Sequence, residues 1–368
     1  RAGMVCALGR VTARADAPGK SDAQKRFGHL ISLDELGGKF TKRVRRKRQS
    51  EFQKGGAALQ SFQVPIGEGC GTCYGQCRLF GFWLTLLLAV PAAGFLVRLF
   101  MIQHDCGHNA FFSSRRANDW TGRVLGVLTL TPYDVWRRTH SIHHSHHGDL
   151  DQRGIGDVLT LTVEEYRARS RWGRLMYRLY RHPVVLFVLG PSYLFILQNR
   201  LPVGLMASGW RYWVSAMGTN AFIVMIVSLI LWLDGLMPLL LIYIPTSVIG
   251  ATIGVWLFYV QHQFEKTHWE SDPDWQIHDA ALEGSSHYKL PRPLQWMTGN
   301  IGIHHVHHLY SRIPFYRLTE VLADQPALAQ AQKLTVRQSL SCVKLKLWDE
   351  KTKRLLSFRQ MTRLYGPT

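Results

Sequence analysis

Long apolar stretches alternate with polar ones along this chain, and their lengths predict a membrane protein. Leu79 to Gln103 is apolar, with one charge at Arg98 and a central Pro91. About 20 apolar residues cross the hydrocarbon core of a bilayer as a helix, and a proline inside such a helix is tolerated as a kink. We therefore expect a spanning helix over 79–103.

A second apolar stretch, 213–260, is too long for one span and suits two. Its only charge is Asp234, which Gly235 follows, and this pair is typical of a tight turn. The pattern predicts a helical hairpin with arms over 214–233 and 237–260.

The polar stretch between these helices predicts elements that lie on the membrane surface. Arginines from 167 to 181 are interleaved with Trp172, Tyr177 and Tyr180, a mixture typical of a helix lying along the interface. Val184–Gln198 is apolar but short and is interrupted by a Gly-Pro pair, so we expect an interfacial or re-entrant segment there.

The formal net charge of +19 is typical of chains that bind nucleic acid or an anionic membrane surface. The apolar runs favour the membrane, and no nucleic-acid motif occurs. Because Lys and Arg are enriched on the cytoplasmic side, the arginine-rich 137–181 is expected there and Asp234 outside. Residues 1–78 conflict with this topology, since they are strongly basic and no earlier apolar run precedes the first helix.

Clustered histidines carry the candidate chemistry. Two stretches contain His-x-x-His-His and another His-x-x-x-His, spacings that place imidazoles on one face of a helix. Imidazole is the commonest protein ligand of transition metals, and these histidines are too many for one four-coordinate zinc. Two metal ions of higher coordination number are expected, and two irons that handle O2 are the leading candidate. Eight histidines follow these spacings, namely His104, His108, His140, His143, His144, His304, His307 and His308, and the single His262 follows the last apolar stretch.

These motifs resemble the three histidine boxes of the membrane-bound fatty acid desaturases, over about residues 79–350. The first box corresponds to 104–108, the second to 136–144 and the third to 299–316, while His262 stands where the family has a further ligand. The short first box resembles the acyl-lipid Δ12/omega-6 branch. The resemblance implies that the nine histidines above hold two iron ions.

Metal-bound histidines usually donate their second N–H to a carboxylate or carbonyl. Candidates for this supporting role are Asp105, Asp149, Asp151, Asp157 and His287. His146, His147 and His305 lie inside the boxes but off the pattern, so support or solvent contact is expected of them rather than metal binding. Trp256, Trp269, Trp275 and Trp296 either line an acyl tunnel or lie at the membrane interface.

The family has four spanning helices with both termini in the cytoplasm, whereas this sequence shows three. The expected fold is an all-α integral membrane protein, with transmembrane helices, a histidine-rich cytoplasmic cap and the first family helix missing. Residues 1–78 are then a basic segment that is non-native or disordered, 79–350 the desaturase domain and 351–368 a cytoplasmic tail.

The expected function is that of an O2-dependent desaturase that inserts a cis double bond into a fatty acyl chain of membrane lipid. The resemblance favours position Δ12, oleate to linoleate, in a bacterial inner membrane with the active site on the cytoplasmic face. No flavin, nucleotide or fused cytochrome b5 motif occurs, so a separate ferredoxin or cytochrome b5 is expected as electron donor.

Three alternative functions also involve clustered histidines in a membrane protein. A hydroxylase, ketolase or acetylenase on the same di-iron scaffold stays open, because box residues do not separate these reactions. A relative of the alkane monooxygenases should carry extra Glu-His motifs and six spans, which this sequence lacks. A histidine-rich metal transporter needs ionisable groups at the bilayer midplane, whereas the hairpin has only Asp234, at its turn.

Overall fold

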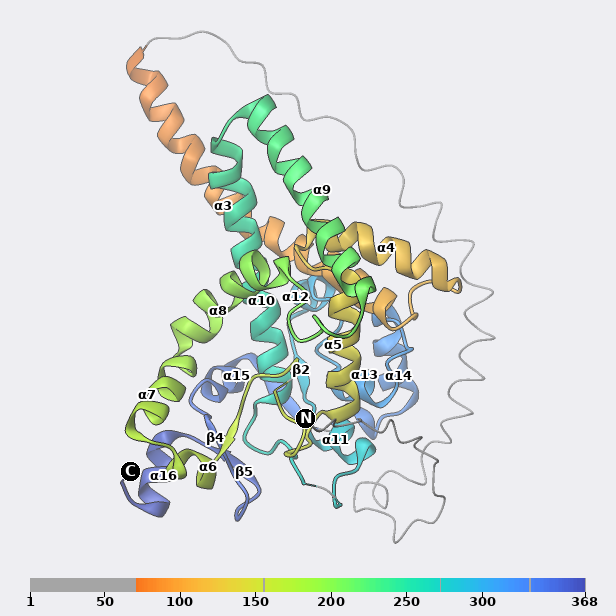
Figure 1. The fold of residues 1–368 in the computed structure, drawn as a ribbon, viewed down its shortest axis with the longest axis vertical. Helices are drawn as coiled ribbons and strands as arrows, with labels where there is room; N and C mark the ends of the chain where they lie inside the picture. Colours follow the sequence, from red (N-terminus) through yellow and green to blue (C-terminus); the bar gives the residue numbers. More distant parts are fainter. Residues whose placement is uncertain (1–70, 155, 272, 331, 368) are drawn as a thin grey trace, which may run out of the picture.

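The computed structural model describes residues 71–154, 156–271, 273–330 and 332–367. Of the segment 1–78, for which a non-native or disordered stretch is predicted, residues 1–70 lie outside this part and residues 71–78 are helical. Three stretches are long and apolar enough to cross a membrane, as expected. They are Gly81–Gly107 within α3 (Gly71–Gly107), α9 (Trp210–Asp234), and Leu239–His262, formed by η4 (Leu239–Tyr243) and α10 (Ile244–His262). Figure 1 shows their far ends projecting together from one side of the body.

The predicted hairpin is confirmed, and its turn depends on glycine. Gly235 ends α9 with a φ of +73°, a conformation that glycine adopts without steric penalty. The returning arm packs on α3, where a Cβ added to Gly250 would lie 3.2 Å from Leu96 Cδ2. Phe222 and Trp232 stay exposed, as side chains facing lipid would be.

The arginine-rich stretch and the short apolar run form one bent unit. The surface helix α7 (Arg171–Tyr180) is followed, after a 58° bend, by a run over Val185–Arg200 that is either part of a broken span or re-entrant. Trp172 of α7 is 73% exposed, on the same side as exposed Met176 and Leu179. The run consists of η1 (Val185–Leu189), α8 (Gly190–Ser192), η2 (Tyr193–Leu197) and η3 (Gln198–Arg200).

A second amphipathic helix, α4 (Arg115–Leu128), was not predicted. The side chain of Ser114 caps the N-terminus of this helix. Trp120, Val124 and Leu128, four residues apart, form an exposed apolar stripe along it. Figure 1 shows α4 lying across the base of the spanning helices. This orientation fits a helix at the membrane interface.

The rest of the body is a mixed layer beneath the spanning helices. Its helices are α5 (Tyr133–His146), α6 (Val163–Ala168), α11 (Ile277–Glu283), α12 (Arg292–Met297), α13 (His304–Leu309), η5 (Phe315–Arg317), α14 (Leu318–Asp324), η6 (Leu328–Gln330), α15 (Val336–Cys342) and α16 (Phe358–Tyr365). Strands are β1 (Leu161–Thr162), β2 (His287–Lys289), β3 (Lys333–Thr335), β4 (Leu347–Asp349) and β5 (Arg354–Leu356).

The described residues are thus mostly helical, as predicted, but not all-α. One sheet has the order β1-β4-β5 and the other pairs β2 with β3, and strands of two or three residues are too short to give an alternating pattern. The segment 351–368, expected as a tail, contributes β5 and α16, whose Met361 is fully buried.

A fully buried arginine holds this layer together. Arg181, after α7, donates hydrogen bonds to the carbonyl oxygens of Leu159 and Leu345 and to the side chains of Thr160 and Gln263. These residues belong to separate segments, so one guanidinium group fastens α7, the end of α10 and the connection before β4.

Candidate metal centre

Four segments distant in the sequence bring the nine predicted histidines together. They are the end of α3, α5, the end of α10, and α13. The imidazoles form two groups, and within each group one ligand nitrogen per residue lies within 4.8 Å of the others. The five-histidine group is His104, His108, His140, His144 and His307, and the four-histidine group is His143, His262, His304 and His308.

Helical spacing explains how the boxes divide between the groups. The i, i+4 pair His140 and His144 of α5 joins the five-histidine group, while His143 turns to the other. On α13 the i, i+4 pair His304 and His308 joins the four-histidine group, while His307 crosses over. At 3.6 residues per turn, the residue four positions on is rotated by about 40° to one side of the first, and the residue three positions on by about 60° to the other side. The same broad face of α5 or α13 can therefore contribute to both groups.

The nitrogen separations fit coordination by a metal ion. The Nε2 atoms of His140 and His144 are 3.2 Å apart, those of His144 and His307 3.1 Å, those of His262 and His304 3.0 Å, and those of His304 and His308 3.1 Å. Two ligands about 2.1 Å from one metal would be about 3.0 Å apart at a right angle and about 3.4 Å apart in a tetrahedron. Three of the four separations are nearer the right-angle value of an octahedral site, and five imidazoles also exceed a tetrahedral set.

The imidazoles are held in the form that binds metals. Burial, together with the neighbouring histidines, holds the pKa values of His140, His144, His307 and His308 well below the ordinary value. These rings are therefore neutral near neutral pH, with a nitrogen lone pair available. The buried His108 Nε2 and His143 Nε2 have no hydrogen-bond partner among the described residues, which also fits atoms positioned for a metal.

Two of the predicted supporting carboxylates contact box histidines. Asp105 Oδ1 lies 3.2 Å from His104 Nδ1, and its Oδ2 accepts the backbone N–H of Phe315. Asp157 Oδ1 lies 2.5 Å from Nδ1 of His143. In both pairs the contact occupies Nδ1 and leaves Nε2 for a metal.

The other supporting candidates lie elsewhere. The carboxylate of Asp149 accepts the backbone N–H of Asp151 and so stabilises a turn, and Asp151 is exposed. The ring of His287 lies 5.6 Å from that of His305, whose Nε2 lies 2.9 Å from the carbonyl oxygen of Leu328. These two histidines stabilise the α13 surroundings and belong to neither group.

His147 is closer to the site than its place off the pattern indicated. Its ring centroid is 4.0 Å from that of His262, and its Nε2 lies 2.9 Å from the carbonyl oxygen of Gly284. It also forms a smaller cluster with His143 and Asp157. By contrast His146 faces the carbonyl of Ile142 in its own helix.

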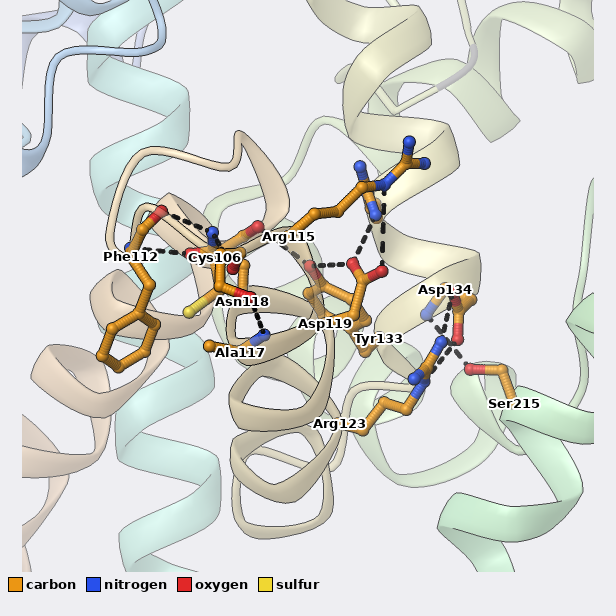
Figure 2. Close-up of polar contacts among 12 residues, drawn as sticks. Cys106, Phe112, Arg115, Ala117, Asn118, Asp119, Arg123, Tyr133, Asp134 and Ser215 are labelled. Carbon is orange, nitrogen blue, oxygen red and sulfur yellow. Dashed lines mark hydrogen bonds and ion pairs between the residues drawn. The ribbon is translucent and has the colours of Figure 1, made fainter.

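A polar layer between α4, α5 and α9 sets the position of α5, as Figure 2 shows. The hydroxyl of Tyr133 donates to the carbonyl oxygen of Cys106, inside the first box, at 2.9 Å, which ties the second box to the first. Asp134 binds Arg123 and Arg211, and these hydrogen bonds outweigh burial and lower its pKa. Charge-assisted hydrogen bonds from two arginines are strong, so they fix the position of this carboxylate in α5.

A cavity of about 600 Å³ lies against the histidines. His104, His140 and His304 form part of its wall, and most of the remaining wall is apolar, from α3, α10 and the bent segment. On α10 its lining residues recur at Ser247, Gly250, Ala251, Gly254, Phe258 and Gln261, one face of the helix. From Ser247 to Gln261 this face is about 21 Å long.

None of the four candidate tryptophans lines this cavity, so of the two alternatives the acyl-tunnel one is not supported for them. Trp136 does line it, and its ring stacks on His140 with centroids 4.7 Å apart. A Cβ at Gly107 would lie 2.7 Å from this ring, so glycine in the first box leaves the space for it. The sequence could have indicated this contact, because Trp136 precedes His140 by four residues and shares its helix face.

Comparison with known proteins agrees with this geometry. A family described as fatty acid desaturase matches residues 81–339. The chain is 46% identical over 276 residues to a fatty acid desaturase of Bacillus subtilis, covering 75% of this chain and 78% of that protein. It is 28% identical over 237 residues to the sn-1 oleoyl-lipid 12-desaturase of Synechocystis (61% and 63% covered). It is also 28% identical over 249 residues to the sn-1 acyl-lipid omega-3 desaturase (ferredoxin) of the same organism (63% and 65% covered).

Proposed function

The chain belongs to the fatty acid desaturase family, and on this premise we propose that it inserts a cis double bond into a fatty acyl chain of membrane lipid, using O2. The observation that carries the proposal is the pair of imidazole groups beside one apolar cavity. Two iron ions, one in each group, would supply the O2 activation that removal of hydrogen from an unactivated methylene requires. The nine histidines would be their ligands.

The protein itself would hold the acyl chain of the substrate and exclude water from it. The stripe on α10 and the facing residues Leu96, Val97 and Phe100 of α3 form an apolar wall on which an acyl chain would lie. The length of this wall, about 21 Å, exceeds the roughly 15 Å that one leaflet's hydrocarbon occupies. His104 and His140, which line the same cavity, would face a methylene pair of that acyl chain.

Asp105 and Asp157 would act on the metal ligands. Each accepts from the Nδ1 of one box histidine, which fixes the ring orientation and makes the ring a stronger donor. Trp136, stacked on His140, would restrict that ring from the cavity side. These contacts preorganise the site before substrate arrives.

The proposal extends to the topology and the partners. All four histidine segments lie on one side of the spanning helices, the side of the arginine-rich α7, which favours the cytoplasmic face of a bacterial inner membrane. Electrons would come from a separate ferredoxin or cytochrome b5. A ferredoxin is named for one Synechocystis relative.

For the position of the double bond we propose Δ12, from oleate to linoleate. The short His104-x3-His108 box and the similarity to an oleoyl-lipid 12-desaturase support this position. The test is expression in a host without polyunsaturated lipids, followed by analysis of fatty acid methyl esters. Linoleate that depends on O2 and iron is expected. A double bond elsewhere would refute the position alone, and a hydroxy or keto product would refute desaturation.

A further inference from the structure

Arg200, a cation in the membrane-facing part of the structure, has no carboxylate partner among the described residues. Arg200, at the end of η3, donates to Asn220 Oδ1 at 2.8 Å and to the carbonyl oxygens of Leu130 at 2.6 Å and Phe195 at 3.3 Å. All three acceptors are uncharged. Its Nε is buried and has no hydrogen-bond partner among the described residues, so part of its donor capacity is unused.

Neighbouring arginines are paired differently. Figure 2 shows Arg123 against Asp134 and Arg115 near Asp119, and the corresponding nitrogen–oxygen distances are 3.0 and 4.0 Å. Within the described part of the chain, no carboxylate forms an ion pair with Arg200. Arg115 and Arg123 thus face carboxylates, whereas Arg200, which faces the hairpin, does not.

The surroundings of Arg200 are apolar. It lines a cavity of about 240 Å³ between the bent segment, α9 and η4–α10, with Ile223, Val227 and Tyr243 among the walls. Both arms of the hairpin are candidate spans. A cation in such a setting is unfavourable without a partner, and it indicates a functional site with a specific partner.

The guanidinium is also held rigidly. Asn220 Nδ2 donates back to the carbonyl oxygen of Arg200 at 2.7 Å, which forms a reciprocal pair between η3 and α9. The carbonyl of Leu130 accepts from both Arg200 and Asn199, and Leu130 itself has a φ of +56°, which is strained for a residue with a side chain. Two segments are thus fixed in position around one side chain, as in a preorganised binding site.

This cavity adjoins the larger one. Leu130, Phe195 and Ser247 line both, so an acyl chain along the larger cavity can place its polar end beside Arg200. We propose that Arg200 binds the carboxyl-derived end of a fatty acyl lipid, either the carboxylate of a free fatty acid or the ester carbonyl of a glycerolipid. The identity of the ligand as an acyl lipid rests on the proposed function.

The composition of the site favours this chemistry over a phosphate group. A phosphate is normally bound by several cationic or backbone donors, whereas here one guanidinium stands in a wall whose other polar side chains are the hydroxyls of Tyr243 and Ser247. A single acyl oxygen with an apolar chain behind it matches one donor group in an apolar cavity.

The test uses purified full-length protein in detergent and the fluorescent fatty acid cis-parinaric acid. Its binding is measured directly, and its displacement is measured with oleate, methyl oleate and dioleoylphosphatidylglycerol. Four variants are compared, namely Arg200→Gln, Arg200→Lys, Val227→Trp and Val224→Trp. Val227→Trp fills the cavity without altering Arg200. Val224→Trp is the matched control, because Val224 lies one turn away on α9 and is exposed.

We expect Arg200→Gln and Val227→Trp to bind about tenfold more weakly or worse, since a charge-assisted hydrogen bond or the chain's space is lost. Arg200→Lys should be intermediate and Val224→Trp unchanged. Displacement by oleate alone identifies the carboxylate, and displacement by methyl oleate and the phospholipid as well identifies the ester. Unchanged binding in Arg200→Gln overturns the proposal.

Should Arg200→Gln fail to fold, equal binding by Val227→Trp and Val224→Trp overturns the proposal instead. Because binding is measured without turnover, the outcome is separate from that of the proposed function. A chain that binds acyl lipid through Arg200 and makes no double bond would contradict the function only.

Discussion

Replacing Asp157 with asparagine tests whether the four-histidine group is a metal site of its own. Among the residues that the structure describes, Asp157 has a hydrogen-bond contact with one box histidine, His143, at 2.5 Å, and His143 belongs to that group. Asparagine keeps the shape and an acceptor oxygen but removes the negative charge. The effect should therefore fall on one metal and spare the other.

The magnitude follows from the contact that changes. Loss of a partner that supports a metal-bound histidine lowers metal affinity by roughly 10- to 100-fold. Because an amide oxygen can still accept the Nδ1–H, Asp157→Asn should lie near tenfold, about 1.4 kcal/mol. Asp157→Ala removes the hydrogen bond altogether and should approach 100-fold, about 2.7 kcal/mol.

The assay is iron retention by purified, iron-loaded protein equilibrated with a graded series of chelator concentrations. The Asp157→Asn variant should lose one equivalent of iron per chain at a chelator concentration about tenfold lower than the parent requires. The second equivalent should be retained as in the parent. Asp151→Asn is the matched control, since this exposed residue lies in the same loop and the substitution makes the same change of charge. If both equivalents leave together, or if Asp151→Asn behaves like Asp157→Asn, the assignment of separate groups is refuted.

Three further predictions concern the cavity, the body and the topology. Gly254 lines the large cavity, and a Cβ added to it would meet no atom within 4 Å. Gly254→Leu should therefore shorten the cavity and lower activity on long acyl chains more than on short ones, and an equal effect on both would contradict this. Gly218→Leu, at an equally open position on α9 outside the cavity, should match the parent. Burial, and to a lesser extent the charge of Arg181, lowers the pKa of Lys346 from 10.5 to about 7. Between these two pH values the unfolded chain binds one more proton than the folded chain, so the free energy of unfolding should rise with pH from about 7 to about 10.5. Lys346→Met should flatten that rise in thermal melts of protein in detergent. A cysteine at the exposed Leu236 should react with an impermeant thiol reagent added outside intact cells and one at Lys351 should not, both relative to the parent chain, whereas the reverse would invert the topology.

The sequence was sufficient for the features that depend on composition and on spacing along one element. The three spanning stretches follow from the lengths of their apolar runs, and the association of the boxes follows from the hairpin returning His262 to the side where His104 leaves the first span. The i, i+4 pairs within each box follow from helical geometry.

Other features depend on where separate elements meet, which spacing does not record. The division of the histidines into five and four depends on how α5 and α13 face each other. The helix α4 escaped prediction because its apolar stripe is narrow and interrupted by polar residues. The strands β1 and β4 are too short to alternate, and the cavity lining depends on the crossing of α3 and α10, so Trp136 was missed in favour of more conspicuous tryptophans.

The position of Arg181 has a consequence for the order in which the protein matures during synthesis. Its guanidinium is completed by the carbonyl of Leu345, a residue that leaves the ribosome only after every box histidine has been made. Until then a cation that is later fully enclosed has to remain hydrated, and the layer beneath the spanning helices cannot close around it. The nascent chain therefore passes through a stage in which all nine histidines have been made and the layer beneath the spanning helices has not yet closed around Arg181.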